Sequence, residues 1–198
     1  MKTGITGGIG SGKSYVCQLL REWGIEVYDC DAAAKRLLNS DHTLIRRMTE
    51  LIGPDAYTNN VPSDRFTRPT LSLNKAVVAQ FLLGSEANAR AIDAIVHPAV
   101  FQDFQESGLE WVESAILFQC GMRPLVDKAI VVTAPLEVRL QRVMQRDHIS
   151  RGKALEWVNR QWPQERLVQL ADMEIVNDGQ TPLKPQIERL LSLVEAPL

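Results

Sequence analysis

A glycine-rich segment near the start of the chain, Gly7–Ser14, constrains the fold more than any other stretch of the sequence. It follows a short apolar run and precedes an apolar-periodic stretch, Tyr15–Leu20, so its context is strand, loop and helix. It matches the pattern G-x-x-x-x-G-K-[ST], in which backbone N–H groups and the positive end of a helix hold a nucleotide phosphate. In that pattern Lys13 reaches the β- and γ-phosphates, and the Ser14 hydroxyl binds Mg²⁺. The alternative is a glycine-rich turn that binds nothing, but it would not explain why every specified residue matches the pattern.

The composition describes a globular protein with one substantial core. The chain has 198 residues, of which 45% are hydrophobic and 23% charged, and its net charge of −2 gives no electrostatic case for nucleic acid as a partner. No apolar run is long enough to span a membrane, and no signal-peptide pattern is expected at the N-terminus. The three cysteines, Cys17, Cys30 and Cys120, show no metal-site spacing, so reduced thiols in a cytoplasmic protein are expected.

Strand patterns alternate with helix patterns along the chain. Strands are expected at residues 2–6, 25–28, 111–118, 129–133 and 173–177. The alternation predicts an α/β fold: a three-layer α/β/α sandwich with a five-stranded parallel sheet that carries the phosphate loop. Residues 32–107 read as a helical insertion with an irregular, turn-rich part at 54–70 and a break at His97-Pro98, because proline disfavours helix in the residue before it.

Ligands of such sheets bind at the carboxyl ends of the strands. This rule places the glycine-rich loop on one rim with Asp29, Asp31, the 115–119 segment and Asn177-Asp178. Asp31 can accept the proton of an acceptor hydroxyl or hold Mg²⁺ through water. Asp29 precedes Asp31 by two positions, so both are expected on one face of an extended strand. The alternative is that either carboxylate caps a helix starting near Ala32.

Arginines 139, 142, 146, 151 and 160 form the second polar cluster. They are either a solvated helix face or a lid over the phosphates that excludes water; we favour the lid, with Arg142 and Arg146 as its contacts. His97 is either a substrate contact or a helix-boundary histidine, and spacing alone favours the second. Trp157 and Trp162 are expected to pack within the lid rather than to stack on an adenine.

These residues resemble the dephospho-coenzyme A kinases over nearly the whole chain. The resemblance rests on Thr6–Ser14, Asp29-Cys30-Asp31, His97-Pro98, Ile116-Leu117-Phe118, Met144–Asp147, Gln161, Ala171-Asp172 and Ile175–Gly179. It implies transfer of a phosphate from MgATP to the ribose 3′-hydroxyl of dephospho-coenzyme A. It also implies that Asp31 is the catalytic carboxylate, that the helical block binds coenzyme A and that Asn177 lies near the adenine.

The full expectation is a single kinase domain. It has a core of about 1–31, 108–139 and 163–198, a coenzyme A-binding insertion of about 32–107 and a lid of about 140–162, in a monomer or weak homo-oligomer without nucleic acid or membrane partners. The catalytic residues expected are Asp31, Lys13, Arg142 and Arg146; the nucleotide contacts are Gly8, Ile9, Gly10, Ser11, Gly12, Lys13, Ser14, Tyr15 and Asn177; the substrate contacts are Asp31 and His97; the Mg²⁺ ligands are Ser14 and Asp31.

The chain departs from the family pattern at two positions. Gln119 stands where the family often has a glutamate, and Trp157 stands where the lid often has an arginine. These departures leave open a catalytically weak relative of the family, and two other functions are also kept open. One is a different small-molecule kinase of the same fold, such as a nucleotide, shikimate or gluconate kinase. The other is a regulatory GTPase, although Asn74-Lys75-Ala76-Val77 lacks the aspartate that guanine recognition needs.

Overall fold

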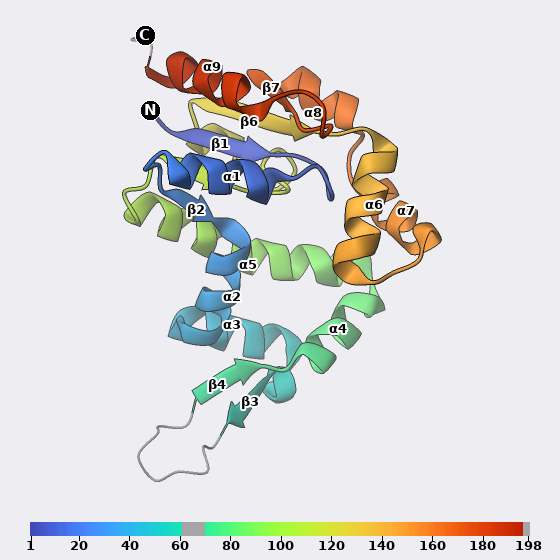
Figure 1. The fold of residues 1–198 in the computed structure, drawn as a ribbon. Helices are drawn as coiled ribbons and strands as arrows, with labels where there is room; N and C mark the ends of the chain where they lie inside the picture. The colour runs from blue at the N-terminus through green and yellow to red at the C-terminus, as the bar shows by residue number, and fades with distance from the viewer. Residues whose placement is uncertain (61–69, 196–198) are drawn as a thin grey trace. The chain divides into compact units, whose positions relative to one another are not determined.

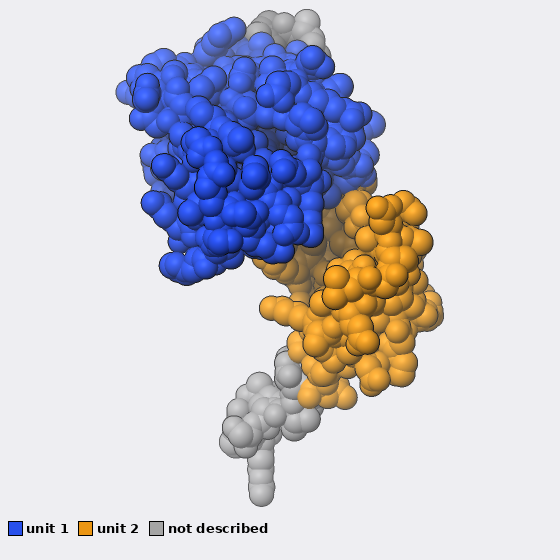
Figure 2. All heavy atoms as spheres, turned by 90° about the vertical axis from the view of Figure 1, so that its right-hand side faces the viewer, with its two compact units in different colours: residues 1–29, 108–198 blue, residues 30–107 orange. Residues whose placement is uncertain are grey.

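The computed structural model describes residues 1–60 and 70–195. The described chain divides into two compact units, residues 1–29 with 108–198 and residues 30–107, shown in blue and orange in Figure 2. The first unit contains the mixed α/β part of the chain and the second is mainly helical (Figure 1). No described helix is long and apolar enough to cross a membrane.

The first unit is built on a five-stranded parallel sheet in the order β2-β5-β1-β6-β7. This confirms the predicted fold class. Its strands are β1 (Thr3–Thr6), β2 (Val27–Asp29), β5 (Trp111–Glu113), β6 (Lys128–Thr133) and β7 (Met173–Val176). Its helices are α1 (Lys13–Glu22), α6 (Leu136–Asp147), α7 (Arg151–Asn159), α8 (Gln164–Leu170) and α9 (Leu183–Glu195).

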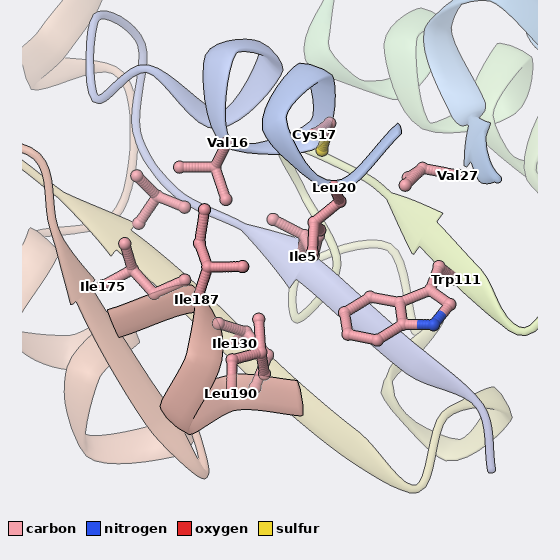
Figure 3. Close-up of a cluster of buried hydrophobic side chains, with 11 residues drawn as sticks. Ile5, Val16, Cys17, Leu20, Val27, Trp111, Ile130, Ile175, Ile187 and Leu190 are labelled. Carbon is pink, nitrogen blue, oxygen red and sulfur yellow. The ribbon is translucent and has the colours of Figure 1, made fainter. Parts of the chain in front are cut away.

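Helices α1 and α9 cover the same face of this sheet. Val16, Cys17 and Leu20 of α1 point to the side chain of Ile5 in β1, as Figure 3 shows. Ile187 and Leu190 of α9 lie in the same buried cluster. On the opposite face, the segment after β5 approaches so closely that a Cβ on Gly4 would lie 2.7 Å from Leu117. The continuous burial of β1 and β6 follows from cover on both faces, as expected for central parallel strands.

The second unit packs three helices around α5 and adds a small hairpin. Its helices are α2 (Cys30–Ser40), α3 (His42–Ile52), α4 (Lys75–Gly84) and α5 (Glu86–Glu106), and its strands are β3 (Tyr57–Asn60) and β4 (Thr70–Leu73). Polar side chains begin three of the helices by accepting a backbone N–H: Asp41 from Leu44, Asn74 from Val77, and Ser85 from Asn88.

Two predicted boundaries are wrong. The break at His97-Pro98 does not occur, because α5 runs through Pro98. Proline removes one helical hydrogen bond, but Ile95, Val96, Val100 and Phe104 on either side of it are buried, and packing maintains the helix. The strand predicted at 111–118 ends at Glu113, and turns follow it.

Three elements were not predicted from the sequence: one helix and two short strands. Helix α8 was not predicted. Residues 57–60 and 70–73, expected within or beside an irregular stretch, pair as antiparallel strands. The remainder of that turn-rich stretch, residues 61–69, lies outside the described residues.

Candidate active site

The glycine-rich loop runs from the end of β1 into the first turn of α1. Gly12 occupies the position before α1 with φ of 89°, and Gly10 has φ of 77°. Both values lie in the left-handed region that glycine adopts at little cost. A Cβ on Gly12 would overlap the Nδ2 atom of Asn177, so close packing also requires glycine there. Glycine therefore meets both the backbone conformation and the close packing of the loop where α1 begins.

A cavity of about 190 Å³ lies against this loop. Its walls combine loop residues with one face of α6, and they are Gly10, Gly12, Lys13, Ser14, Arg142, Val143 and Arg146. The structure thus brings together the lysine, the serine and both arginines singled out from the sequence. Three cationic side chains around a glycine-rich loop make a site suited to phosphate groups.

Arg142 ties the loop to the neighbouring strand end. Its Nη1 donates to the carbonyl oxygens of Gly10 and Ser11, each at 3.3 Å, and its Nη2 donates to Oδ1 of Asn177 at 3.3 Å. The Asn177 Nδ2 donates in turn to the Ser11 carbonyl at 2.9 Å. Asn177 directly follows β7 and is buried. These bonds join residues that lie at opposite ends of the sequence.

Arg146 lies one helical turn further along α6. It pairs with Asp147, with 2.7 Å between Nη2 and Oδ2. This hydrogen bond raises the pKa of the guanidinium and lowers the pKa of the Asp147 carboxyl, so both groups are charged near neutral pH. Arg151 and Arg160 pair instead with Glu137 and Glu156 on the surface. Among the described arginines of the predicted lid, the two in the cavity wall are thus Arg142 and Arg146.

Glu113 is a site residue that the sequence analysis missed. The Ser14 hydroxyl donates to its Oε1 at 3.2 Å. The buried Cys17 thiol is a second neighbour: burial and Glu113 together raise the pKa of that thiol. The predicted strand ran from 111 to 118, so it placed Glu113 in the strand interior rather than at the strand end. A charged residue directly after the apolar pair Trp111-Val112 was the available signal for a strand end.

Asp29 lies beside Glu113, because the two residues are in register at the ends of β2 and β5. Register partners in parallel strands point to the same face of the sheet. The expectation that Asp29 and Asp31 share a face of one strand is wrong. The chain turns helical at Cys30, and Asp31 is exposed in the first turn of α2. Asp31 is therefore neither a strand residue nor the cap of a helix starting at Ala32.

Asp31 and His97 both belong to the second unit. His97 lies inside α5, 3.6 Å from Oδ1 of Asp93 and stacked on Phe101. It is not at a helix boundary, so the reason for favouring a boundary histidine is removed. Tyr15, expected among the nucleotide contacts, is 51% exposed and is not in the described wall of the cavity.

The two departures from the family pattern have different surroundings. Gln119 has a buried Oε1 that accepts no hydrogen bond within the described chain. Trp157 packs against the cluster of Leu140, Val143 and Ala154. Trp162 lies under the guanidinium of Arg166, with 3.6 Å between Cζ and the ring centroid. Trp157 thus packs within the lid as expected, whereas the contact of Trp162 is with α8, outside the predicted lid.

The parallel sheet, the phosphate loop between β1 and α1, and the arginine-bearing helix beside the loop define a phosphate-loop kinase. The family model described as dephospho-CoA kinase matches residues 1–182. A dephospho-CoA kinase of Bacteroides fragilis is 33% identical over 201 residues, covering 98% of this chain and 93% of the relative. The chain belongs to the dephospho-CoA kinase family.

Two solved structures share the fold. A crystal structure from Thermus thermophilus has a TM-score of 0.74 at 31% identity, covering 98% of this chain and 95% of the other. A dephospho-CoA kinase from Campylobacter jejuni has a TM-score of 0.60 at 18% identity, covering 98% and 96%, and supports the fold alone. Family membership makes the chain an enzyme with dephospho-CoA kinase activity and implies ATP as its phosphate donor. It also decides against the regulatory GTPase and the other small-molecule kinases.

Proposed function

We propose that the chain transfers the γ-phosphate of MgATP to the ribose 3′-hydroxyl of dephospho-coenzyme A, giving coenzyme A and ADP. The observation that carries the proposal is the cavity in which Lys13, Arg142 and Arg146 converge on the phosphate loop, in a chain of this family. Phosphoryl transfer needs mainly positioning and positive charge around the moving phosphate, and these side chains supply both.

The nucleotide binds along the loop in this proposal. Residues 8–15 surround the phosphates, with Lys13 on the β- and γ-phosphates, and Asn177 lies near the adenine. Arg142 and Arg146 neutralise the charge that develops on the transferring group. The segment 140–162 acts as a lid that keeps water, a competing acceptor, away from the γ-phosphate.

The donor set beside the loop fits Mg²⁺. This ion prefers oxygen ligands and keeps several waters, and Ser14 and Glu113 present a hydroxyl and a carboxylate 3.2 Å apart. In this proposal the substrate phosphates supply most of the other ligands of the ion. When bound, Mg²⁺ neutralises charge on the β- and γ-phosphates. Asp31 contributes to the ion through water or, in its main role, accepts the proton of the acceptor hydroxyl.

The acceptor binds to the helical insertion of residues 32–107, with His97 as one of its contacts. The Asp31 carboxylate is exposed and so accessible to a substrate. The proposal includes a cytoplasmic protein, monomeric or weakly self-associating.

Mass spectrometry of the products tests the proposal directly. The protein is incubated with MgATP and dephospho-coenzyme A, and formation of coenzyme A with ADP is expected. Shikimate, gluconate and nucleoside monophosphates serve as competing acceptors, and GTP as a competing donor. The Lys13→Ala variant is the matched blank, because it removes the main cation of the loop. Phosphorylation of another acceptor in preference to dephospho-coenzyme A would refute the proposal.

A further inference from the structure

Arg139 is a buried arginine for which the proposed mechanism has no use. It lies in the second turn of α6 and is only 6% exposed. Burial lowers the pKa of its guanidinium, and the nearby Glu165 carboxylate partly offsets that effect. A buried charge is costly unless its hydrogen-bonding groups are satisfied. The contacts of Arg139 therefore indicate which part of the structure the buried guanidinium stabilises.

Those contacts meet at one residue of the phosphate loop. Arg139 donates from Nε to the carbonyl oxygen of Ile9 at 2.9 Å. The backbone N–H of Ile9 donates to Oε1 of Gln161 at 2.6 Å. The Ile9 side chain packs against the cluster of Leu140, Val143 and Ala154, which α6 and α7 share. The amide, the carbonyl and the side chain of Ile9 are thus all held by the segment 139–161.

Two loop glycines make room for this arrangement. Positions 8 and 10 are unspecified in the motif, yet both are glycine here. A Cβ on Gly8 would overlap Nη2 of Arg139, and a Cβ on Gly10 would lie 2.5 Å from the Arg139 carbonyl oxygen. The loop backbone and Arg139 are therefore in close contact, and this contact requires glycine at both positions.

We propose that Arg139 is a positioning residue for nucleotide binding, which acts by fixing the peptide groups of Ile9 together with Gln161. Arg139 is not in the described wall of the phosphate cavity, although it lines a second cavity of about 290 Å³ together with Gln161. Its hydrogen bond to the Ile9 carbonyl carries the proposed effect through the loop backbone. Holding the Ile9 carbonyl and amide orients the following N–H groups before the phosphates arrive, and preorganised donors bind an anion better than mobile ones. The inference rests on the proposed function, because it takes ATP as the ligand of the loop.

The Arg139→Met and Arg139→Gln variants separate hydrogen bonding from charge. Both are neutral, but Nε2 of glutamine stands at the same point along the side chain as Nε of arginine, while methionine has no donor. Calorimetric ATP affinity and the KM for each substrate are measured for both. We expect ATP affinity about tenfold or more weaker in Arg139→Met, because a hydrogen bond from a charged group is lost. We expect substantial recovery in Arg139→Gln and an unchanged KM for dephospho-coenzyme A in both.

The controls make each outcome decisive. Arg189→Gln removes an exposed arginine of α9, outside the loop and the proposed lid, and it should bind ATP like the unmodified protein. If Arg139→Met does not fold, Gln161→Leu removes the other contact to Ile9 and should raise the KM for ATP alone. Equal losses in the methionine and glutamine variants would assign the effect to charge and overturn the inference, as would unchanged affinity in both. If the unmodified protein itself binds no ATP, it is the proposed function that fails.

Discussion

The hydroxyl group of Ser14 donates a hydrogen bond to Oε1 of Glu113, with 3.2 Å between the two oxygens. Ser14 lies in the first turn of α1, and Glu113 is the last residue of β5. The contact joins the helix that follows the phosphate loop to the strand beside β1. The contact places the Glu113 carboxylate beside the Ser14 hydroxyl, which the loop motif supplies.

Replacing Glu113 with glutamine should weaken the apparent affinity of the enzyme for Mg²⁺. The amide retains a hydrogen bond with Ser14 but loses the negative charge that favours the cation. Loss of an outer ligand partner typically changes metal affinity or activity by about 10- to 100-fold. We expect the Mg²⁺ concentration for half-maximal activity to rise by about this factor, as measured by titration at saturating ATP.

Glu110→Gln is the matched control for this change. Glu110 precedes β5 on the same segment, is 64% exposed and pairs with the N-terminal amine. Its loss should leave the Mg²⁺ titration unchanged. A normal titration in Glu113→Gln would remove Glu113 from the proposed metal site.

Replacing Asp31 with asparagine should slow turnover by about 10²-fold or more, the usual contribution of a general base. ATP affinity should stay nearly intact, because Asp31 is proposed to face the acceptor. A coupled assay of ADP release measures turnover, and calorimetry measures ATP binding. Asp41→Asn is the control, since asparagine caps α3 as well as aspartate does.

Asp29→Asn tests the competing carboxylate at the end of β2. If this variant loses turnover while Asp31→Asn retains it, the base has been assigned to the wrong residue of the Asp29-Cys30-Asp31 segment. Loss in Asp31→Asn alone would support the assignment.

Gly12→Ala should destabilise the protein more than Gly24→Ala. Both glycines have left-handed φ values, 89° and 82°, so both substitutions cost about 1–2 kcal/mol of backbone strain. A Cβ on Gly12 also overlaps the Asn177 amide, whereas a Cβ on Gly24 meets no described atom within 4 Å. Overpacking of this kind typically adds about 1–3 kcal/mol. Urea unfolding measures the difference, and equal free energies of unfolding would contradict the close packing of Gly12 against Asn177.

The Cys17 thiol should resist labelling in the native protein. It is fully buried, and burial with the adjacent Glu113 carboxylate raises its pKa well above the ordinary value of 9.0. The native thiol therefore stays protonated when the unfolded thiol ionises, so its contribution to stability is complete below pH 9 and declines as the pH rises above it. Peptide mapping after alkylation at pH 8 should find Cys120, which is partly exposed, labelled before Cys17. Rapid native labelling of Cys17 would show that the helix α1 opens far more readily than its packing indicates.

Local patterns in the sequence predicted the strands, most helices and the phosphate loop. The run 129–133 is apolar and β-branched, and it forms β6 with one further residue. Prediction failed where long-range packing outweighs local preference. Pro98 marks a break by its own chemistry, but burial of Val96 and Val100 keeps α5 continuous. The Trp111–Phe118 run reads as one strand, although only its first three residues pair with β1.

The phosphate loop itself was determined by sequence alone, since its glycines, Lys13 and Ser14 are adjacent and its shape depends on local backbone freedom. The tertiary structure decided what surrounds the loop. Glu113 reaches Ser14 across 99 residues, and Arg139 reaches Ile9 across 130. Sheet order and helix packing bring these partners together. Local sequence patterns cannot predict contacts between residues so far apart along the chain. The sequence therefore determined where a phosphate binds, and the fold decided which side chains hold that site in shape.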